Sequence, residues 1–301
     1  MPPPFSGGAI GSTRRRESVL SFASCVIKPT CALPARRALF ADARHFQIAS
    51  LASLLVLNIL WFDFGASPPQ AAVTIIAALA TQFVCVRLCA GPEFDWRSPV
   101  ITGLSLSLLL RTQEPALWVA AALLAIGSKF LIRRRGKHFF NPANFAIVAL
   151  LLSSGDVWVS PGQWGSSVWL AFLLVCCGGL VLQRAARADI AIAFLGAYAG
   201  LLLLRAVMLG DPMAIPLHQL QSGALLIFAF FMITDPRSTP DRRVGRVLFA
   251  VAVAVFAYSL QFDWQIRAGL FFALAALSPT TPLIDRLFPA TRFAWRRPME
   301  V

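Results

Sequence analysis

Charge is scarce in this chain. Only 14% of its 301 residues are Asp, Glu, Lys or Arg, whereas 57% are hydrophobic, and the mean hydropathy is +0.69. A soluble domain cannot bury that much apolar surface in a single core, so the composition excludes a soluble globular protein. We expect an all-α membrane protein whose surface mostly faces lipid.

Further absences exclude several kinds of site. The six cysteines show neither a paired CxxC framework nor the spacing of zinc ligands. The three histidines lie at the ends of predicted helices, so we expect no haem held in mid-membrane. No Asp or Glu falls at the middle of a predicted span, although ion pathways usually carry such carboxylates. We therefore expect no metal site, and the chain alone is a poor candidate for an ion pump.

Apolar runs predict the membrane spans. About 20 residues of helix cross a hydrocarbon core of roughly 30 Å. The third and fifth of the predicted spans are shorter than this, which indicates half-helices or helices lying in protein-lined space. The predicted spans are residues 46–62, 70–90, 99–110, 116–132, 142–154, 164–183, 189–209, 219–234, 245–261 and 266–283.

The positive charges predict the orientation. With ten spans and a cytoplasmic N-terminus, 24 of the 27 Lys and Arg residues fall on the cytoplasmic side, and only Arg111, Arg205 and Arg267 fall outside. This asymmetry favours a topology with both termini in the cytoplasm. The net charge of +13 therefore reflects topology, and we expect contact with membrane lipids but not with nucleic acid.

The order of motifs suggests two inverted five-helix repeats. We divide the chain into a disordered basic cytoplasmic tail (1–41), repeat 1 (42–155), repeat 2 (156–288) and a basic cytoplasmic tail (289–301). An inverted repeat places ligand sites where its halves meet. Matching steps in the two halves are Ser98-Pro-Val-Ile-Thr-Gly103 with Gln221-Ser-Gly223, Arg111-Thr112 with Thr234-Asp235, and Asn141-Pro142 with Thr281-Pro282.

The loop from Lys129 to Asn144 carries more polar chemistry than a topogenic linker needs. Pro142 suits the first turn of a helix, whose free amides attract an anion or a carbonyl oxygen. Asn141 and Asn144 can share one helix face and offer donors and acceptors, which match the edge of a flavin or quinone ring. The alternative is that these residues form only an N-cap and a polar helix contact.

A second motif lies between Ser222 and Pro240. Ser222 and Gly223 are small and allow a helix or planar ligand to approach closely. Thr234 and Asp235 end an apolar span, because Pro236 cannot continue a helix. The alternative for Asp235 is an ordinary ion pair with the arginines of its loop.

These motifs resemble a known family. The segments are Gly136-Lys-His-Phe-Phe-Asn-Pro-Ala-Asn-Phe145, Phe230-Phe-Met-Ile-Thr-Asp-Pro-Arg-Ser-Thr-Pro240 and Thr281-Pro-Leu-Ile-Asp285. Over residues 42–288 the chain resembles the RnfD/NqrB family, which comprises membrane components of the Rnf electron-transport complex and of the sodium-pumping NADH:quinone oxidoreductase. The resemblance implies an inverted-repeat fold, flavin in the membrane domain, partner subunits and electron transfer toward quinone.

One feature of that family is missing. Its members carry FMN on the threonine of a Ser-Gly-Ala-Thr motif, whereas this chain has Ser222-Gly-Ala-Leu225, and leucine has no hydroxyl to esterify. We therefore expect no covalent FMN. In this respect the chain is similar to short stand-alone members, some of which look like accessory membrane proteins of natural-product biosynthesis.

Together these features predict a multi-pass protein of the bacterial inner membrane that takes part in electron transport. It would hold FMN or riboflavin, or a quinone, noncovalently between its repeats. The alternatives are a small-molecule transporter or channel, and a redox-silent accessory subunit. The predicted binding residues are Lys129, Lys137, Asn141, Asn144, Ser222, Gly223, Thr234 and Asp235.

Overall fold

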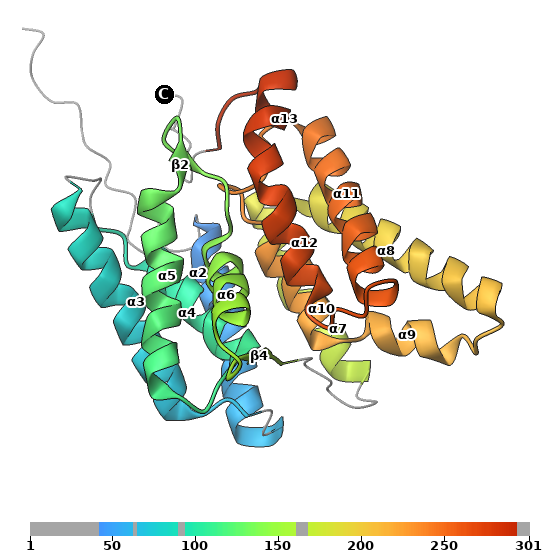
Figure 1. Cartoon of the computed structure of the whole chain (residues 1–301), viewed down its shortest axis with the longest axis horizontal. Coiled ribbons are helices and arrows are strands. Elements are labelled where there is room, and N and C mark those ends of the chain that lie inside the picture. The colour runs from blue at the N-terminus through green and yellow to red at the C-terminus, as the bar shows by residue number, and fades with distance from the viewer. Residues whose placement is uncertain (1–41, 63–64, 90–93, 161–167, 294–301) are drawn as a thin grey trace, which may run out of the picture. The chain divides into compact units, whose positions relative to one another are not determined.

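The structure is a computed structural model that describes residues 42–62, 65–89, 94–160 and 168–293. The predicted tail at 1–41 lies outside the described residues, as do the last eight residues of the predicted tail at 289–301. What is described is mostly helix, with two short antiparallel strand pairs (Figure 1). The strands β1 (Leu110–Arg111) and β4 (Trp158–Val159) form one pair, and β2 (Arg133–Arg134) and β3 (Lys137–His138) form the other.

Each predicted span coincides with one helix or with consecutive helices. The eighth and tenth spans are built from short α-helices joined to a π-helical or a 3₁₀-helical turn. The helices are α2 (Ala43–Leu57) with π-helix η1 (Asn58–Phe62), α3 (Pro68–Leu88), α4 (Arg97–Leu109), α5 (Pro115–Leu131), α6 (Pro142–Ser153), α7 (Val168–Ala185), α8 (Ala188–Leu209), α9 (Ala214–Leu220), α10 (Gly223–Ile227) with π-helix η2 (Phe228–Met232), α11 (Arg243–Phe262), α12 (Gly269–Leu277), 3₁₀-helix η3 (Ser278–Thr280) and α13 (Thr281–Leu287).

The chain is a multi-pass membrane protein. Within the described residues, four stretches of helix are long and apolar enough to cross a membrane, namely Ala43–Trp61, α3, α8 and α11. A fifth crossing exists if α9 and the segment Gly223–Met232, which meet at 48°, form one broken span. The count of ten crossings stays a prediction.

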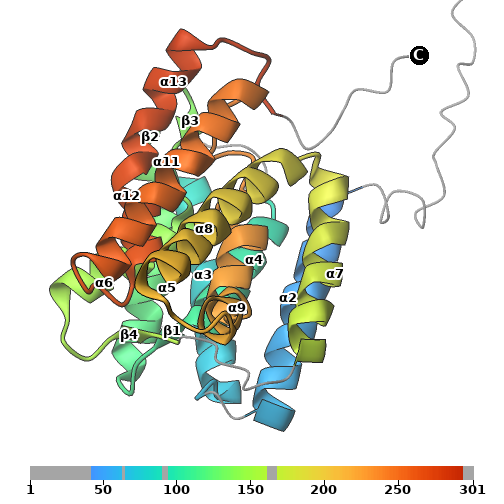
Figure 2. The ribbon, with the colours of Figure 1, turned by 90° about the vertical axis from the view of Figure 1, so that its right-hand side faces the viewer.

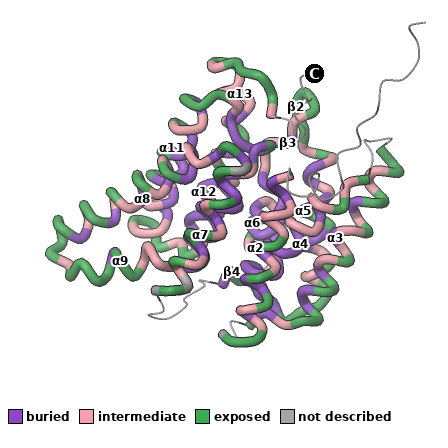
Figure 3. Tube along the Cα trace, turned by 180° about the vertical axis from the view of Figure 1, so that it is seen from behind, coloured by how far each residue is buried: buried purple, intermediate pink, exposed green. Residues whose placement is uncertain are grey.

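The helices pack in corresponding sets. In the first half α3 packs on α4 and α5, and α5 packs on α6; in the second half α11 packs on α8 and α12. The halves meet where α2 lies beside α7, and α6 beside α12 (Figure 2). Buried residues concentrate on the central helices (Figure 3). The large apolar side chains that α3, α8 and α9 expose include Ile76, Ile192 and Leu217. Such outward faces suit contact with lipid.

Two of the central helices are short. The helix α4 has 13 residues and α6 has 12, so each is about 20 Å long and cannot cross the hydrocarbon core alone. Their backbone ends need partners inside the protein. At the C-terminal end of α4, the buried guanidinium of Arg111 donates hydrogen bonds to the carbonyl oxygens of Ser107 (2.8 Å), Leu110 (2.9 Å) and Leu108 (3.0 Å). Arg111, one of the three basic residues predicted to lie on the non-cytoplasmic side, therefore caps the C-terminal end of α4.

The segment α10–η2 is deeply buried in the second half, and every residue from Gly223 to Met232 is buried. The helix α7 approaches it at Gly178, where a Cβ atom would lie 2.5 Å from Cγ and 2.7 Å from Cβ of Phe230. A glycine is required there, because those atoms lie near the backbone and cannot swing away. The adjacent Gly179 has open space around it.

We expect Gly178→Ala to destabilise the protein by about 1–3 kcal/mol, because the added methyl group forces α7 and η2 apart. The matched control is Gly179→Ala, which adds the same methyl group to the same helix without a clash and should be neutral or slightly stabilising. Thermal unfolding of both variants in detergent measures the difference. Equal unfolding temperatures would contradict the close approach of α7 to Phe230.

Candidate functional site

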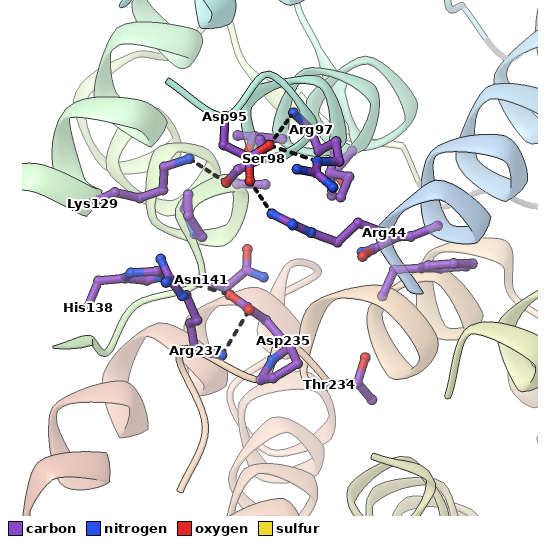
Figure 4. Close-up of a pocket in the computed structure, with 18 of the residues that line it drawn as sticks. Arg44, Asp95, Arg97, Ser98, Lys129, His138, Asn141, Thr234, Asp235 and Arg237 are labelled. Atoms are coloured by element: carbon purple, nitrogen blue, oxygen red, sulfur yellow. Dashed lines mark hydrogen bonds and ion pairs between the residues drawn. The ribbon is translucent and has the colours of Figure 1, made fainter. Parts of the chain in front are cut away.

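A pocket of about 650 Å³ opens where helix ends of both halves meet. The first half contributes the start of α2, the start of α4, the end of α5, β3 and the start of α6, and the second half contributes the end of α7 and the turn after η2 (Figure 4). Ligand sites commonly have volumes of about 300–1,000 Å³. The walls combine apolar side chains such as Ile101, Val181 and Phe231 with many charged groups.

One wall is a closed network of four charges. Arg44 pairs with Asp42 (2.7 Å) and with Asp95, while Arg97 pairs with Asp42 (2.7 Å) and Asp95 (2.9 Å). Burial alone would raise the pKa of both carboxyl groups, but their hydrogen bonds and charge interactions with Arg44 and Arg97 leave the pKa values of Asp42 and Asp95 lowered. This network fixes the starts of α2 and α4 against each other and neutralises itself.

Lys129 is the exceptional charge of the pocket. Its side chain is 5% exposed, and its Nζ donates a hydrogen bond to Oγ of Ser98 at 2.9 Å. No carboxylate of the described residues lies within ion-pair distance of it. A buried ammonium group with a single hydroxyl acceptor is costly unless another negative or carbonyl group approaches. Lys129 is therefore suited to hold an anionic or carbonyl oxygen of a ligand.

Gln82 adds an acceptor to the same pocket. It lies on α3, it is 9% exposed, and its buried Oε1 has no hydrogen-bond partner among the described residues. Buried polar atoms are normally paired, so an orphaned acceptor at a pocket wall suits a ligand donor. The prediction from sequence missed Gln82, yet a signal existed, because Gln82 continues the buried stripe of Ala71, Thr74 and Ala78 on an otherwise apolar helix.

Asn141, Thr234 and Asp235 line the pocket, but the protein already uses all three side chains. Oδ1 of Asp235 accepts from the backbone N–H of Arg237 at 3.1 Å. Asn141 Oδ1 accepts from the backbone N–H of Asn144 (3.1 Å), and its Nδ2 donates to the carbonyl of Met232 (3.2 Å). Thr234 Oγ1 donates to the carbonyl of Phe230 at 2.6 Å. Asn141 is thus an N-cap that also joins α6 to η2, and of these three residues Asp235 presents a carboxylate to the pocket.

The remaining four predicted residues lie away from this pocket. Lys137 lines a second cavity, where its Nζ binds Asp241 (3.0 Å) and Asp285 (2.8 Å). Asn144 is fully buried and donates to the carbonyl of Phe271 in α12 (3.1 Å). Ser222 and Gly223 begin α10, at the opposite end of α10–η2 from Thr234 and about 15 Å along the helix axis.

The sequence is similar to a family of membrane proteins over its second half. Residues 154–294 match the model of the NQR2, RnfD, RnfE family. The D subunit of the proton-translocating ferredoxin:NAD(+) oxidoreductase complex of Clostridium ljungdahlii is 24% identical over 294 residues, covering 78% of this chain and 87% of that protein. The chain is similar to this family over the segment from α7 to α13.

Two further relatives share a shorter segment. The D subunits of the ion-translocating oxidoreductase complexes of Citrobacter koseri and Vibrio vulnificus are each 32% identical over 125 residues, which is 41% of this chain and 34% of theirs. The chain thus spans about a third of the length of these relatives. The family match covers α7 to α13 and therefore includes Thr234 and Asp235, whereas Lys129 and Gln82 precede it.

A buried histidine also lines the pocket. His138, in β3, lies 3.9 Å from Asp235 between Nε2 and Oδ2. Burial lowers the pKa of His138 well below its ordinary value of 6.5, and this effect exceeds the opposing influence of the Asp235 charge. The imidazole is therefore neutral at pH 7.

Because the fold resists protonation of His138, the free energy of unfolding should fall as the pH drops below about 6.5, where the unfolded chain takes up the proton. When the pH is lowered from about 7 to about 5, we expect the unfolding temperature of His138→Gln to fall by less than that of the wild type. Thermal unfolding in detergent at both pH values measures this difference. The exposed His218 of α9 provides the matched control, and His218→Gln should follow the wild type. An unchanged pH dependence in His138→Gln would contradict the neutral state of that histidine.

Proposed function

We propose that this chain is the RnfD-type membrane subunit of an ion-translocating oxidoreductase complex in a bacterial inner membrane. The support is the match of residues 154–294 to the family model and the names of the relatives, each of which is the D subunit of such a complex. Its partners would be the other subunits of that complex. The membrane-spanning helices supply the expected environment.

The proposed topology has ten spans in two inverted repeats with both termini in the cytoplasm. The support is the correspondence of packing, in which α3 with α5 and α6 matches α8 with α11 and α12. Across the boundary α2 meets α7 and α6 meets α12, so the first and last helices of each half meet their counterparts. The arginine-rich hairpin of β2 and β3 and the loop before α11 lie on the same expected side.

The pocket would hold FMN or riboflavin, or a quinone, without a covalent link. The observation that carries this proposal is a buried amino group, Lys129, beside a buried acceptor, Gln82 Oε1, in one pocket of about 650 Å³. Among the described residues Lys129 has no carboxylate partner and Gln82 Oε1 has no hydrogen-bond partner. Lys129 would bind a ring carbonyl or anionic oxygen, Gln82 would accept from a ring N–H or hydroxyl group, and Ile101 and Phe231 would pack on the ring. A bound flavin or quinone supplies reversible electron acceptance, which the side chains here cannot supply.

We expect the detergent-purified protein to show visible flavin absorbance or extractable quinone, and Lys129→Met to lose most of it. Methionine nearly preserves the length of the side chain and removes the amino group together with its hydrogen bond to Ser98, so the apolar packing and the fold should persist. The control is Arg242→Met, because Arg242 is exposed and lies outside the pocket lining.

The state of the cofactor separates the possible outcomes. Flavin that moves to the supernatant after acid precipitation is noncovalent, as proposed, whereas flavin that stays in the pellet would contradict this. An unchanged cofactor content in folded Lys129→Met would remove Lys129 from the site. A purified protein with neither flavin nor quinone would favour the transporter or accessory-subunit alternatives.

A further inference from the structure

A second cavity, of about 190 Å³, lies between the β2–β3 hairpin and the C-terminal segment that follows α12. The hairpin and α13 lie at the same end of the helical unit (Figure 1). Arg135 and Gly136 form its two-residue turn, with φ values of +53° and +80°, as a tight hairpin of this length requires. Beyond α13, Nη1 of Arg292 donates to the carbonyl of Arg135 at 2.8 Å and closes the cavity.

The charges around this cavity do not balance. Its lining has two acidic residues, Asp241 and Asp285, and both are bound to Lys137. Four more basic side chains line it, and no carboxylate of the described residues pairs with them. These are Arg134, Arg135, Arg286 and Arg292. Five basic groups against two acidic ones leave three positive charges in excess, which would attract a compact anion.

The size of the cavity narrows the choice of anion. It is smaller than the roughly 300 Å³ at which sites for ring cofactors begin, but it can admit a phosphate group. Guanidinium groups bind phosphate through paired hydrogen bonds. A phosphate-bearing headgroup and free phosphate share this chemistry.

The surface beside the cavity favours the lipid. Leu283 and Leu287 lie one turn apart on α13 and are 55% and 67% exposed. Leu131, at the end of α5 and close in sequence to the hairpin, is 84% exposed. A membrane lipid would place its acyl chains along such leucines and its headgroup among the arginines, whereas free phosphate leaves the leucines uncovered.

We propose that this basic cavity is a specific binding site for the phosphate headgroup of an anionic phospholipid. The site ties the hairpin of the first half to the C-terminal segment of the second half through one lipid. It is separate from the pocket around Lys129 and does not depend on a chromophore.

The test is lipid binding by the full-length protein in detergent. We expect phosphatidylglycerol to raise the thermal unfolding temperature, phosphatidylcholine to have little effect, and native mass spectrometry to show a retained phosphatidylglycerol molecule. In the double variant Arg134→Gln/Arg286→Gln the affinity for phosphatidylglycerol should fall by roughly an order of magnitude. Within the described part of the chain, neither side chain makes a hydrogen bond or ion pair that the fold requires.

The matched control is Arg242→Gln/Arg243→Gln, which removes two exposed charges at the start of α11 without touching the cavity. It should bind the lipid like the wild type. Equal loss in both double variants would show a diffuse surface effect and overturn the site. Equal stabilisation of the wild type by inorganic phosphate would overturn the assignment to lipid. If the first double variant unfolds, Arg286→Gln alone tests the same loss of affinity.

Discussion

Helices too short to cross a membrane, α4 and α6, impose the constraint on which this structure depends. In hydrocarbon, a free carbonyl or amide group has no water to bond, so each broken helix needs a partner supplied by the protein. The end of α4 obtains it from Arg111, and the start of α6 obtains it from Asn141. Arg111 and Asn141, polar residues in an apolar chain, therefore serve to satisfy backbone groups at helix ends.

Several of these polar contacts also join the two halves. Asn141 bonds to the carbonyl of Met232, Asn144 to the carbonyl of Phe271, and Lys137 to Asp241 and Asp285. Asn144, for which a role at the ring edge was predicted, is fully buried between α6 and α12. These residues thus connect helix ends of the two halves. The pocket lies between the helix ends, where no side chain of the described residues fills the space.

The sequence was a good guide to the helices and a partial guide to the site. Hydropathy alone located nearly every helical range, because long apolar runs have few other solutions in lipid. Lys129 and Asp235 were also found, since both lie at the ends of apolar spans near helix-breaking residues. The ion network of Asp42, Arg44 and Asp95 was not predicted, because charges at span ends look alike in sequence whether they orient the chain or line a pocket.

The charge pattern of the main pocket bears on what a ligand would experience there. Arg97 and Arg44 are neutralised by their aspartates, so Lys129 remains as a buried amino group without a carboxylate partner among the described residues. A group that accepts electrons becomes more negative, and Lys129 in its protonated form would stabilise that reduced state more than the oxidised one. Because Lys129 is shielded from water, its effect is stronger than that of a surface lysine. The same burial that makes an unpaired lysine costly for the fold would therefore make it effective in raising the reduction potential of a bound carrier.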